Sequence, residues 1–123
     1  GGILPASNGD IPLDFGDKLA EEGCFVGSHA VVVLSDQDNM WDVATNLLKF
    51  FAHESCGQCT PCRNGTEKAV AMMSTVNPDT ALLGELSVAM ADASICGLGQ
   101  AASNPLISVM KHFPEDVGGS NNA

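Results

Sequence analysis

Four cysteines are spaced so that they could bind one metal centre. Cys56, Cys59 and Cys62 stand at C-x2-C-x2-C spacing within residues 54–63, and Cys96 follows much later. Cysteines three apart on a tight loop can direct three thiolates at one centre, and a cubane cluster requires a fourth thiolate from elsewhere. The pattern therefore predicts one [4Fe-4S] site, with Cys56, Cys59, Cys62 and Cys96 as its cofactor-binding and metal ligands. It singles out no catalytic residue.

Other interpretations of these cysteines remain open. The alternative from another functional class is a zinc-stabilised interaction module without a redox role. It is disfavoured because structural zinc sites usually pair two C-x2-C knuckles, whereas here three cysteines are close in sequence and the fourth is remote. An enzyme with an open iron site would need only three cysteine ligands, and Cys96 disfavours it. A disulfide framework is disfavoured by the odd total of five cysteines and by the lack of a recognisable signal peptide.

Three residues near the motif have ordinary alternatives to a role at the site. Cys24 lies beside Phe25 and Val26, where a lone cysteine is more often a small buried apolar residue, so we leave it out of the ligand set. His53 and Arg63 flank the cysteine loop and could donate hydrogen bonds to its sulfurs. An ordinary role at a helix end is an equal alternative for both.

Composition limits the classes of function. The 123 residues amount to one ordinary domain, and an apolar fraction of 45% is enough to bury a core. The formal net charge is −10 with only five Lys and Arg, which opposes binding to nucleic acid because such binding depends on neutralising phosphates. No apolar run is long enough to predict a membrane span. We expect a protein of a reducing compartment, the cytoplasm.

Helical periodicity begins just before the cysteine loop. Apolar residues from Met40 to Phe51 recur at intervals of three and four, which predicts a helix over residues 39–53 with Asn39 as its cap. Thr60-Pro61 is typical of a second helix start, which would place Cys62 in the first turn. A helix N-terminus stabilises nearby negative charge, and a cluster bound by thiolates carries such charge.

Two more helix starts and a tail complete the predicted second half. Asn77-Pro78 and Asn104-Pro105 repeat the pattern of a capping side chain before proline. Short connections between four such helices predict an antiparallel bundle over residues 39–117, with Cys96 on the loop before the last helix. Residues 118–123 are rich in Gly, Ser and Asn and are expected to form a flexible tail.

The first 38 residues indicate a different kind of structure. A short helix is expected around residues 15–22, and the β-branched run at 30–34 predicts a buried strand. One strand is too few for an independent sheet, so residues 1–38 are expected to be part of a larger α/β domain.

Residues 54–63 together with Cys96 resemble the C-terminal cluster domain of the flavin- and NAD-binding subunit of complex I and its relatives in formate dehydrogenases and bidirectional hydrogenases. Residues 1–34 resemble the latter part of the ubiquitin-like (β-grasp, SLBB) domain that precedes the bundle in that family. The resemblance implies a mainly α fold, with a four-helix iron–sulfur bundle after a partial β-grasp segment. It also implies electron transfer through one [4Fe-4S] cluster, with the same four cysteines as ligands.

The resemblance further implies cofactors and partners outside this chain. The family's FMN and NAD sites lie upstream of anything in this sequence, so no complete active site is expected here. Expected partners are other subunits of a multi-subunit oxidoreductase, such as a molybdenum or hydrogenase subunit carrying Fe-S clusters and a thioredoxin-like 2Fe-2S subunit. Residues 92–100 and Asn104-Pro105 are more similar to the formate dehydrogenase and hydrogenase members than to complex I, which favours the β subunit of an NAD-dependent formate dehydrogenase. The alternative is the same role in an NAD(P)-linked bidirectional hydrogenase or in complex I.

Overall fold

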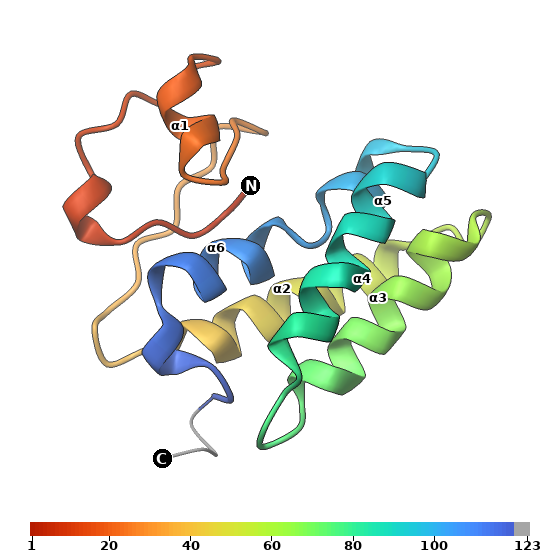
Figure 1. Ribbon diagram of the computed structural model, residues 1–123. Coiled ribbons are helices and arrows are strands. Elements are labelled where there is room, and N and C mark those ends of the chain that lie inside the picture. Colours follow the sequence, from red (N-terminus) through yellow and green to blue (C-terminus); the bar gives the residue numbers. More distant parts are fainter. Residues whose placement is uncertain (120–123) are drawn as a thin grey trace.

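The computed structural model describes residues 1–119, and all regular structure within that range is helical (Figure 1). The prediction of a mainly α fold is therefore confirmed. The elements are η1 (Ala6–Asn8), α1 (Asp17–Glu21), α2 (Met40–Glu54), α3 (Thr60–Met73), α4 (Thr80–Ala93), α5 (Gly97–Ala101), α6 (Asn104–His112) and η2 (Pro114–Asp116). The short helix α5 occupies residues that were expected to belong to a loop.

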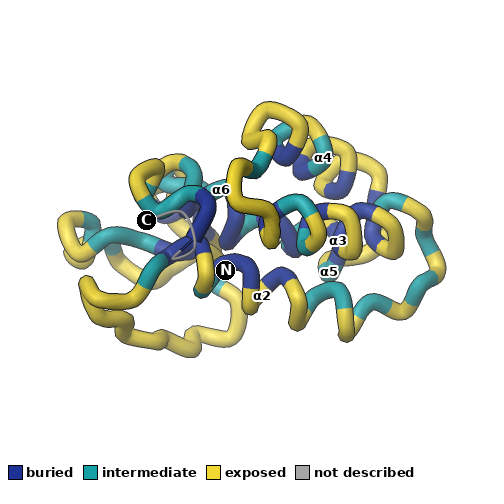
Figure 2. The backbone as a smooth tube through the Cα atoms, turned by 90° about the horizontal axis from the view of Figure 1, so that it is seen from below, coloured by how far each residue is buried: buried dark blue, intermediate teal, exposed yellow. Residues whose placement is uncertain are grey.

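Helices α2, α3, α4 and α6 pack around one apolar core, and Figure 2 shows their buried stretches facing inward. The amphipathic spacing of each helix provides the inward face. The buried residues of this core are Ile3, Met40, Trp41, Ala44, Leu48, Ala69, Met73, Leu83, Met90, Ala102, Leu106 and Val109. The contacts of this one core therefore fix the four helices relative to one another, and with them the loops that carry the cysteines.

Two contacts fix how α3 lies against its neighbours. Trp41 of α2 is 1% exposed, and its indole Nε1 donates a 2.9 Å hydrogen bond to the carbonyl of Met73 at the end of α3. On the other side of α3, a Cβ added to Gly65 would lie 2.6 Å from Cγ and Sδ of Met90. The absent side chain at Gly65 is thus what lets α3 and α4 approach closely.

The helix starts agree with the predicted caps in part. Asn39 caps α2, because its Oδ1 accepts a 3.1 Å hydrogen bond from the backbone N–H of Asp42. Helices α3 and α6 begin one residue earlier than predicted, so that Thr60 and Asn104 are the first helical residues and each proline is the second.

The predicted start of α4 at Asn77-Pro78 is wrong. Asp79 is the cap, and its Oδ1 accepts a 3.0 Å hydrogen bond from the backbone N–H of Leu82. The carboxylate of Asp79, two positions after Asn77, satisfies a free N–H of the first turn, so the helix starts after Asp79 instead.

The strand predicted at residues 30–34 is also not seen. Residues 31–34 have no regular secondary structure and are exposed, with Val33 at 90% of its full accessible surface, and no strand is present in residues 1–119. A strand is defined by pairing with a neighbour, and the described part of the chain offers it none. The β-grasp part of the expected fold class is therefore not seen, and α1 is shorter than the helix expected over residues 15–22.

Residues 1–38 are attached to α6 by polar contacts. The backbone N–H of Ile3 donates a 2.9 Å hydrogen bond to Oγ of Ser108, and Nζ of Lys111 donates a 2.7 Å hydrogen bond to the carbonyl of Glu21. His112 Nε2 lies 3.4 Å from the carboxylate of Glu22. These contacts hold the N-terminal segment beside α6, away from the end of the bundle where α2 meets α3 (Figure 1).

The C-terminal end of the described chain folds back on the start of α2. Gly118 and Gly119 are buried, and a Cβ at Gly119 would lie 3.5 Å from Cδ1 of Trp41. The rest of the predicted tail, residues 120–123, lies outside the described residues. Among the helices of residues 1–119, none is long and apolar enough to cross a bilayer.

Candidate functional site: a four-cysteine cavity

The α2–α3 loop and the α4–α5 loop meet at one end of the bundle and bring the four predicted cysteines around one cavity of about 180 Å³. Cys56 lies in the first loop, Cys59 is the residue before α3, Cys62 is in the first turn of α3, and Cys96 is the residue before α5. The lining residues are Glu54, Ser55, Cys56, Gln58, Cys59, Cys62, Ile95, Cys96 and Leu98. We call this the cysteine cavity.

The cavity has a buried side and an open side. Cys62 is 5% exposed and Cys59 is half-buried, whereas Cys56 and Cys96 are exposed. A group bound here would be shielded from water on the α3 side and would face solvent or another protein across Cys56 and Cys96.

Arg63 holds the cysteine loop in shape. Its Nη1 donates a 2.6 Å hydrogen bond to the carbonyl of Gly57, and its Nη2 donates a 3.3 Å hydrogen bond to Oγ1 of Thr60. Gly57 has φ +79°, a left-handed conformation that a residue with a side chain rarely adopts. Arg63 therefore braces the loop backbone, and of the two roles considered for it, donation to a sulfur is not the one it has in this structure.

Ser55 makes a hydroxyl contact that the sequence pattern does not predict. Its Oγ lies 3.3 Å from Sγ of Cys62 and accepts a hydrogen bond from the backbone N–H of Gly57, also at 3.3 Å. The position of Ser55 next to Cys56 is the one signal in the sequence that could have indicated it. His53, the other expected donor, is exposed at the end of α2.

A second serine lies beside Cys62, one of the residues that line the cavity. Ser94, the residue that follows the end of α4, is 5% exposed, and its hydroxyl has no hydrogen-bond partner within the described residues. A Cβ added to Gly99 would meet Oγ of Ser94 and would lie 2.6 Å from its Cβ and 2.8 Å from Cβ of Cys62. Gly99 thus leaves the space in which Ser94 lies against Cys62.

The surroundings of Cys59 favour its thiolate. The pKa of the Cys59 thiol is lowered, first because the backbone N–H of Ile95 donates to the sulfur, then because the N–H of Cys62 does, with a smaller effect from the Ser94 hydroxyl. Cys59 and Cys62 also lie at the N-terminus of α3, where free N–H groups favour negative charge. Thiolates are the form in which cysteine binds metal.

The arrangement of the sulfurs is relevant to which metal group fits. In a tetrahedral zinc site, four sulfurs lie about 2.3 Å from one ion and hence about 3.8 Å from each other. Within residues 1–119, no three Cys, His, Asp or Glu side chains lie close enough to hold a single ion. In a cubane cluster each thiolate binds a different iron, so its ligands are spread more widely. Four cysteines around one cavity, without single-ion convergence, suit a cluster better.

Cys24 lies outside this site. It is 6% exposed, packs against Gly2, and its Sγ lies 3.8 Å from the carbonyl of Glu22. Burial raises the pKa of the Cys24 thiol, which keeps it protonated. This is the structural role expected for a small apolar residue.

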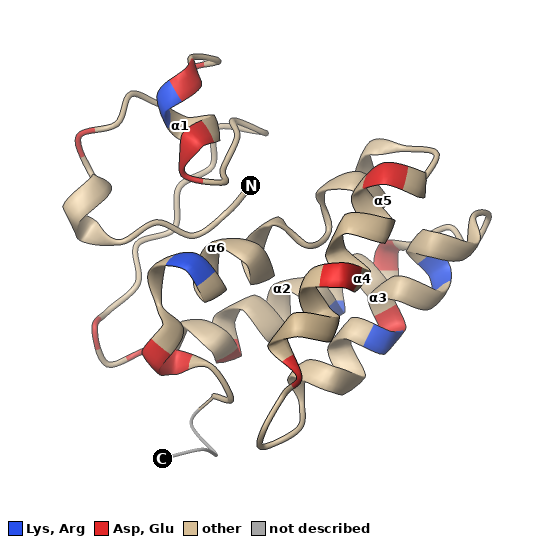
Figure 3. Cartoon of the chain, in the orientation of Figure 1, with Lys and Arg blue, Asp and Glu red and all other residues tan. Residues whose placement is uncertain are grey.

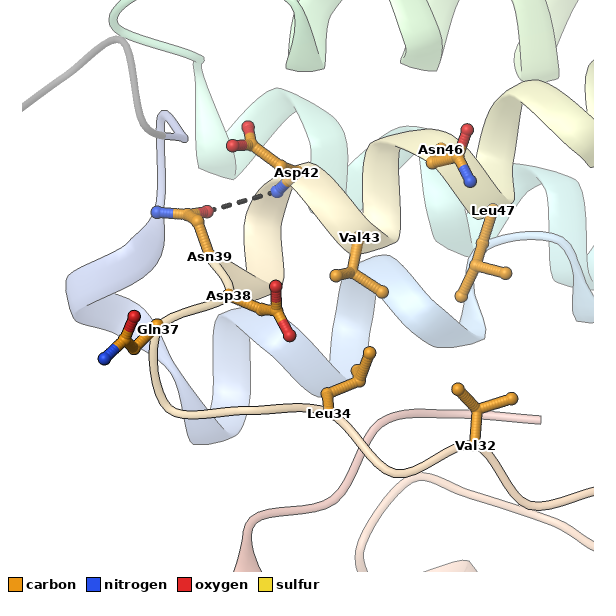
Figure 4. Close-up of a pocket in the computed structure, with 9 residues that line it drawn as sticks. All are labelled: Val32, Leu34, Gln37, Asp38, Asn39, Asp42, Val43, Asn46 and Leu47. Carbon is orange, nitrogen blue, oxygen red and sulfur yellow. Dashed lines mark hydrogen bonds between the residues drawn. The ribbon is translucent and has the colours of Figure 1, made fainter.

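A larger hollow, of about 600 Å³, lies elsewhere and carries no cysteine (Figure 4). It is open and lies between residues 32–38 and the start of α2, where the side chains of Val32, Leu34 and Val43 face one another. The hollow reaches along α2 as far as Leu47, and α2 ends at Glu54, so about 10 Å of helix separates it from the cysteine loop. Its lining of valine, leucine, glutamine, asparagine and aspartate offers no group suited to redox chemistry, and we place the functional site at the cysteine cavity.

Charge is distributed without a basic face. The five Lys and Arg are spread over α1, α2, α3 and α6, among the more numerous acidic residues (Figure 3). A polyanion would need several of them together.

Comparisons with known proteins place the same region in a family. Residues 42–119 match the family described as "NADH-ubiquinone oxidoreductase-F iron-sulfur binding region". The chain is 33% identical over 117 residues to an NADH-quinone oxidoreductase subunit of Rhizobium meliloti, covering 90% of this chain and 28% of that protein. It is 34% identical over 122 residues to NADP-reducing hydrogenase subunit HndC of Solidesulfovibrio fructosivorans, covering 94% of this chain and 25% of that protein. The chain thus spans about a quarter of the length of these relatives.

A solved structure has a similar fold. It is a crystal structure of an NAD+-reducing [NiFe]-hydrogenase in the H2-reduced state, with a TM-score of 0.59 and 35% sequence identity. The match covers 70% of this chain and 16% of the hydrogenase chain.

Proposed function

This chain belongs to the NADH-ubiquinone oxidoreductase-F iron–sulfur binding family, and we propose that it transfers electrons through one [4Fe-4S] cluster held by Cys56, Cys59, Cys62 and Cys96. Such a cluster is the cofactor of the family's region. The observation that carries the ligand assignment is that these four cysteines, from two loops far apart in the sequence, line one cavity.

The chain's own residues would hold the cluster in stated ways. Cys62 binds from the buried side, and Cys56 and Cys96 from the exposed side. The N–H groups at the start of α3 and the N–H of Ile95 stabilise the negative charge of the thiolates. Arg63 keeps the loop closed by binding the carbonyl of Gly57. The bound cluster supplies one-electron chemistry, which can divide the two-electron load of a flavin.

We propose that this electron transfer serves an NAD-linked oxidoreductase of several subunits. The relatives are named as subunits of NADH-quinone oxidoreductase and of an NADP-reducing hydrogenase, and the chain covers about a quarter of each. FMN and NAD would then be bound by parts that correspond to the remaining three quarters. The exposed side of the cysteine cavity, at Cys56 and Cys96, is where electrons would leave or enter the chain.

The finer assignment is the β subunit of an NAD-dependent formate dehydrogenase. It rests on residues 92–100 and Asn104-Pro105, whereas the relatives named above are subunits of NADH-quinone oxidoreductase and of hydrogenase. NAD reduction by the assembled complex with formate, and separately with hydrogen, distinguishes the two. Reduction with hydrogen alone would favour the hydrogenase assignment.

Two further assignments belong to this proposal. We propose a division into residues 1–38 and residues 39–117, because α2, α3, α4 and α6 share one core to which, among the described residues of the first segment, Ile3 alone contributes. We also propose a cytoplasmic location, because an odd total of five cysteines, four of them proposed as cluster ligands, fits a reducing compartment better than a disulfide framework.

Iron analysis of cysteine variants tests the ligand set. Cys56→Ala, Cys59→Ala, Cys62→Ala and Cys96→Ala should each lower iron and sulfide content and weaken the brown absorption and the EPR signal of the reduced protein. Cys24→Ala is the matched control, because it removes a buried thiol far from the cavity and should keep its iron. Full iron content in any of the four variants, or a colourless zinc protein after anaerobic purification, would refute the proposal.

A further inference from the structure

Two serines border the cysteine cavity in equivalent positions. Ser55 is the residue after α2 and Ser94 the residue after α4, while the helices that begin near the cavity, α3 and α5, are preceded by Cys59 and Cys96. A serine therefore follows each helix that ends near the cavity, and a cysteine precedes each helix that begins there. Hydroxyls beside sulfur ligands matter because hydrogen bonds to the sulfurs change the reduction potential of a cluster.

If Cys62 is a cluster ligand, the donor and the acceptor in its contact with Ser55 are fixed. The Ser55 Oγ accepts from the N–H of Gly57 and lies 3.3 Å from Sγ of Cys62, where either atom could donate. A cysteine that binds metal is a thiolate and has no proton to give. The Ser55 hydroxyl is then the donor and the sulfur the acceptor.

The Ser94 hydroxyl is buried without a partner. Its Oγ makes no hydrogen bond in residues 1–119, and Ser94 lies with Cβ of Cys62 against the same side of Gly99. Native structures rarely leave a buried polar group unpaired without a reason. Gly99 leaves the space that Ser94 occupies beside Cys62, because a Cβ at Gly99 would meet this hydroxyl.

We propose that the Ser55 hydroxyl donates a hydrogen bond to the sulfur of Cys62, that the buried Ser94 hydroxyl donates to a neighbouring ligand sulfur when the cluster is bound, and that both thereby raise the reduction potential of the cluster. The inference rests on the proposed function, since it requires these cysteines to be cluster ligands. Both serines are positioning residues that act through the sulfurs.

The physical reason is the charge that reduction adds. Reduction places one more negative charge on the iron and its sulfurs, and a hydrogen bond to a charged acceptor is about twice as strong as a neutral one. Donors therefore stabilise the reduced form more than the oxidised form. The Arg63 guanidinium does not act as a donor to the sulfurs in this structure, because it is bound to the carbonyl of Gly57 and the hydroxyl of Thr60.

EPR-monitored redox titration of the cluster-loaded full chain tests the proposal. Ser55→Ala and Ser94→Ala should each lower the potential, so that the ratio of reduced to oxidised cluster at a fixed potential falls by up to about tenfold, which corresponds to about 59 mV for one electron. Ser103→Ala is the matched control. Ser103 is also 5% exposed with an unpaired hydroxyl in the described residues, but it is the residue before α6 and does not pack with Cys62 around Gly99, so its variant should titrate as wild type.

Two further measurements separate this inference from a structural effect. Ser55→Thr keeps a hydroxyl and should restore the wild-type potential. Resonance Raman spectra of the wild-type protein should show Fe–S(Cys) bands that shift between H2O and D2O, and the shift should be smaller in Ser55→Ala, which keeps the test valid if Ser94→Ala loads poorly. Normal iron with an unchanged potential in both alanine variants, or bands that do not shift, would overturn the inference. Loss of iron that is confined to the cysteine variants would still support the ligand set.

Discussion

Adding one methyl group at Gly99 should displace the cysteine cavity, whereas the same change at Gly97 should not. Both glycines belong to α5, and the structure gives neither of them a positive φ, so alanine meets no backbone strain at either position. A Cβ at Gly97 would have nothing within 4 Å. A Cβ at Gly99 would lie 2.6 Å from Cβ of Ser94 and 2.8 Å from Cβ of Cys62, in addition to meeting the Ser94 hydroxyl.

The magnitude follows from comparing the two variants. Alanine is favoured over glycine within a helix by up to about 1 kcal/mol, and this gain applies to both positions. Carbon atoms prefer separations of about 3.5–4.0 Å, so Gly99→Ala must push α5 away from α3 or α4. The atoms in the way are Cβ atoms next to the backbone and cannot rotate aside. Overpacking of this kind costs about 1–3 kcal/mol, which is the expected difference between the two variants.

Thermal unfolding and iron analysis measure the effect. At about 4 °C per kcal/mol, the midpoint of Gly99→Ala should lie roughly 4–12 °C below that of Gly97→Ala. Its iron content should also fall, because Cys62 and the neighbouring Ser94 are displaced. Gly97→Ala should keep its iron and unfold at or above the wild-type temperature. Equal midpoints and equal iron contents would refute the reasoning that Gly99 maintains the cavity.

Two other predictions concern the cap of α4 and the cysteine outside the site. The cap of α4 is the Asp79 carboxylate, which accepts a hydrogen bond from the N–H of Leu82. In thermal denaturation, Asp79→Ala should therefore lower the unfolding free energy by about 1 kcal/mol, whereas Asn77→Ala should change it little. A larger loss in Asn77→Ala than in Asp79→Ala would make Asn77 the cap. Burial raises the pKa of the Cys24 thiol, so the folded chain holds this proton more tightly than the unfolded chain, and the resulting stability is present below about pH 9 and lost as the pH rises through the raised value. The thermal midpoint should therefore fall less steeply at alkaline pH in Cys24→Ala than in the wild type, and identical slopes would contradict this account.

Local patterns predict much of the helical structure. Periodicity places a helix at residues 39–53, and α2 is found at Met40–Glu54, because its apolar residues recur at the helical period and Asn39 caps it. The start of α3 is predicted within one residue. The C-x2-C-x2-C spacing selects the cysteines that the structure gathers around one cavity, although their role as ligands stays a prediction.

Other features depend on which groups a segment contacts in the folded chain, and the sequence pattern does not specify these contacts. Residues 31–34 have the composition of a buried strand, but β structure requires a neighbour to pair with, and in residues 1–119 this segment has no regular secondary structure and is exposed. The predicted start of α4 is wrong because Asn77-Pro78 and Asp79 are all acceptable near a helix start, and only the observed hydrogen bond to Leu82 chooses among them.

Side-chain chemistry and spacing within about ten residues are enough to identify the residues that could ligate a cluster and to locate most of the helices. One feature of the site depends instead on the packing of the helices, because Ser94 and Gly99 come from beyond α4 and lie against Cys62 of α3. This contact requires α3 and α4 to approach closely, which Gly65 permits at Met90. The contacts of Ser55 with Cys62 and of Arg63 with Gly57 are local, but the side-chain directions that make them are seen only in the structure. Packing joins segments that are far apart in the chain, and no periodic pattern within one segment specifies its distance to another.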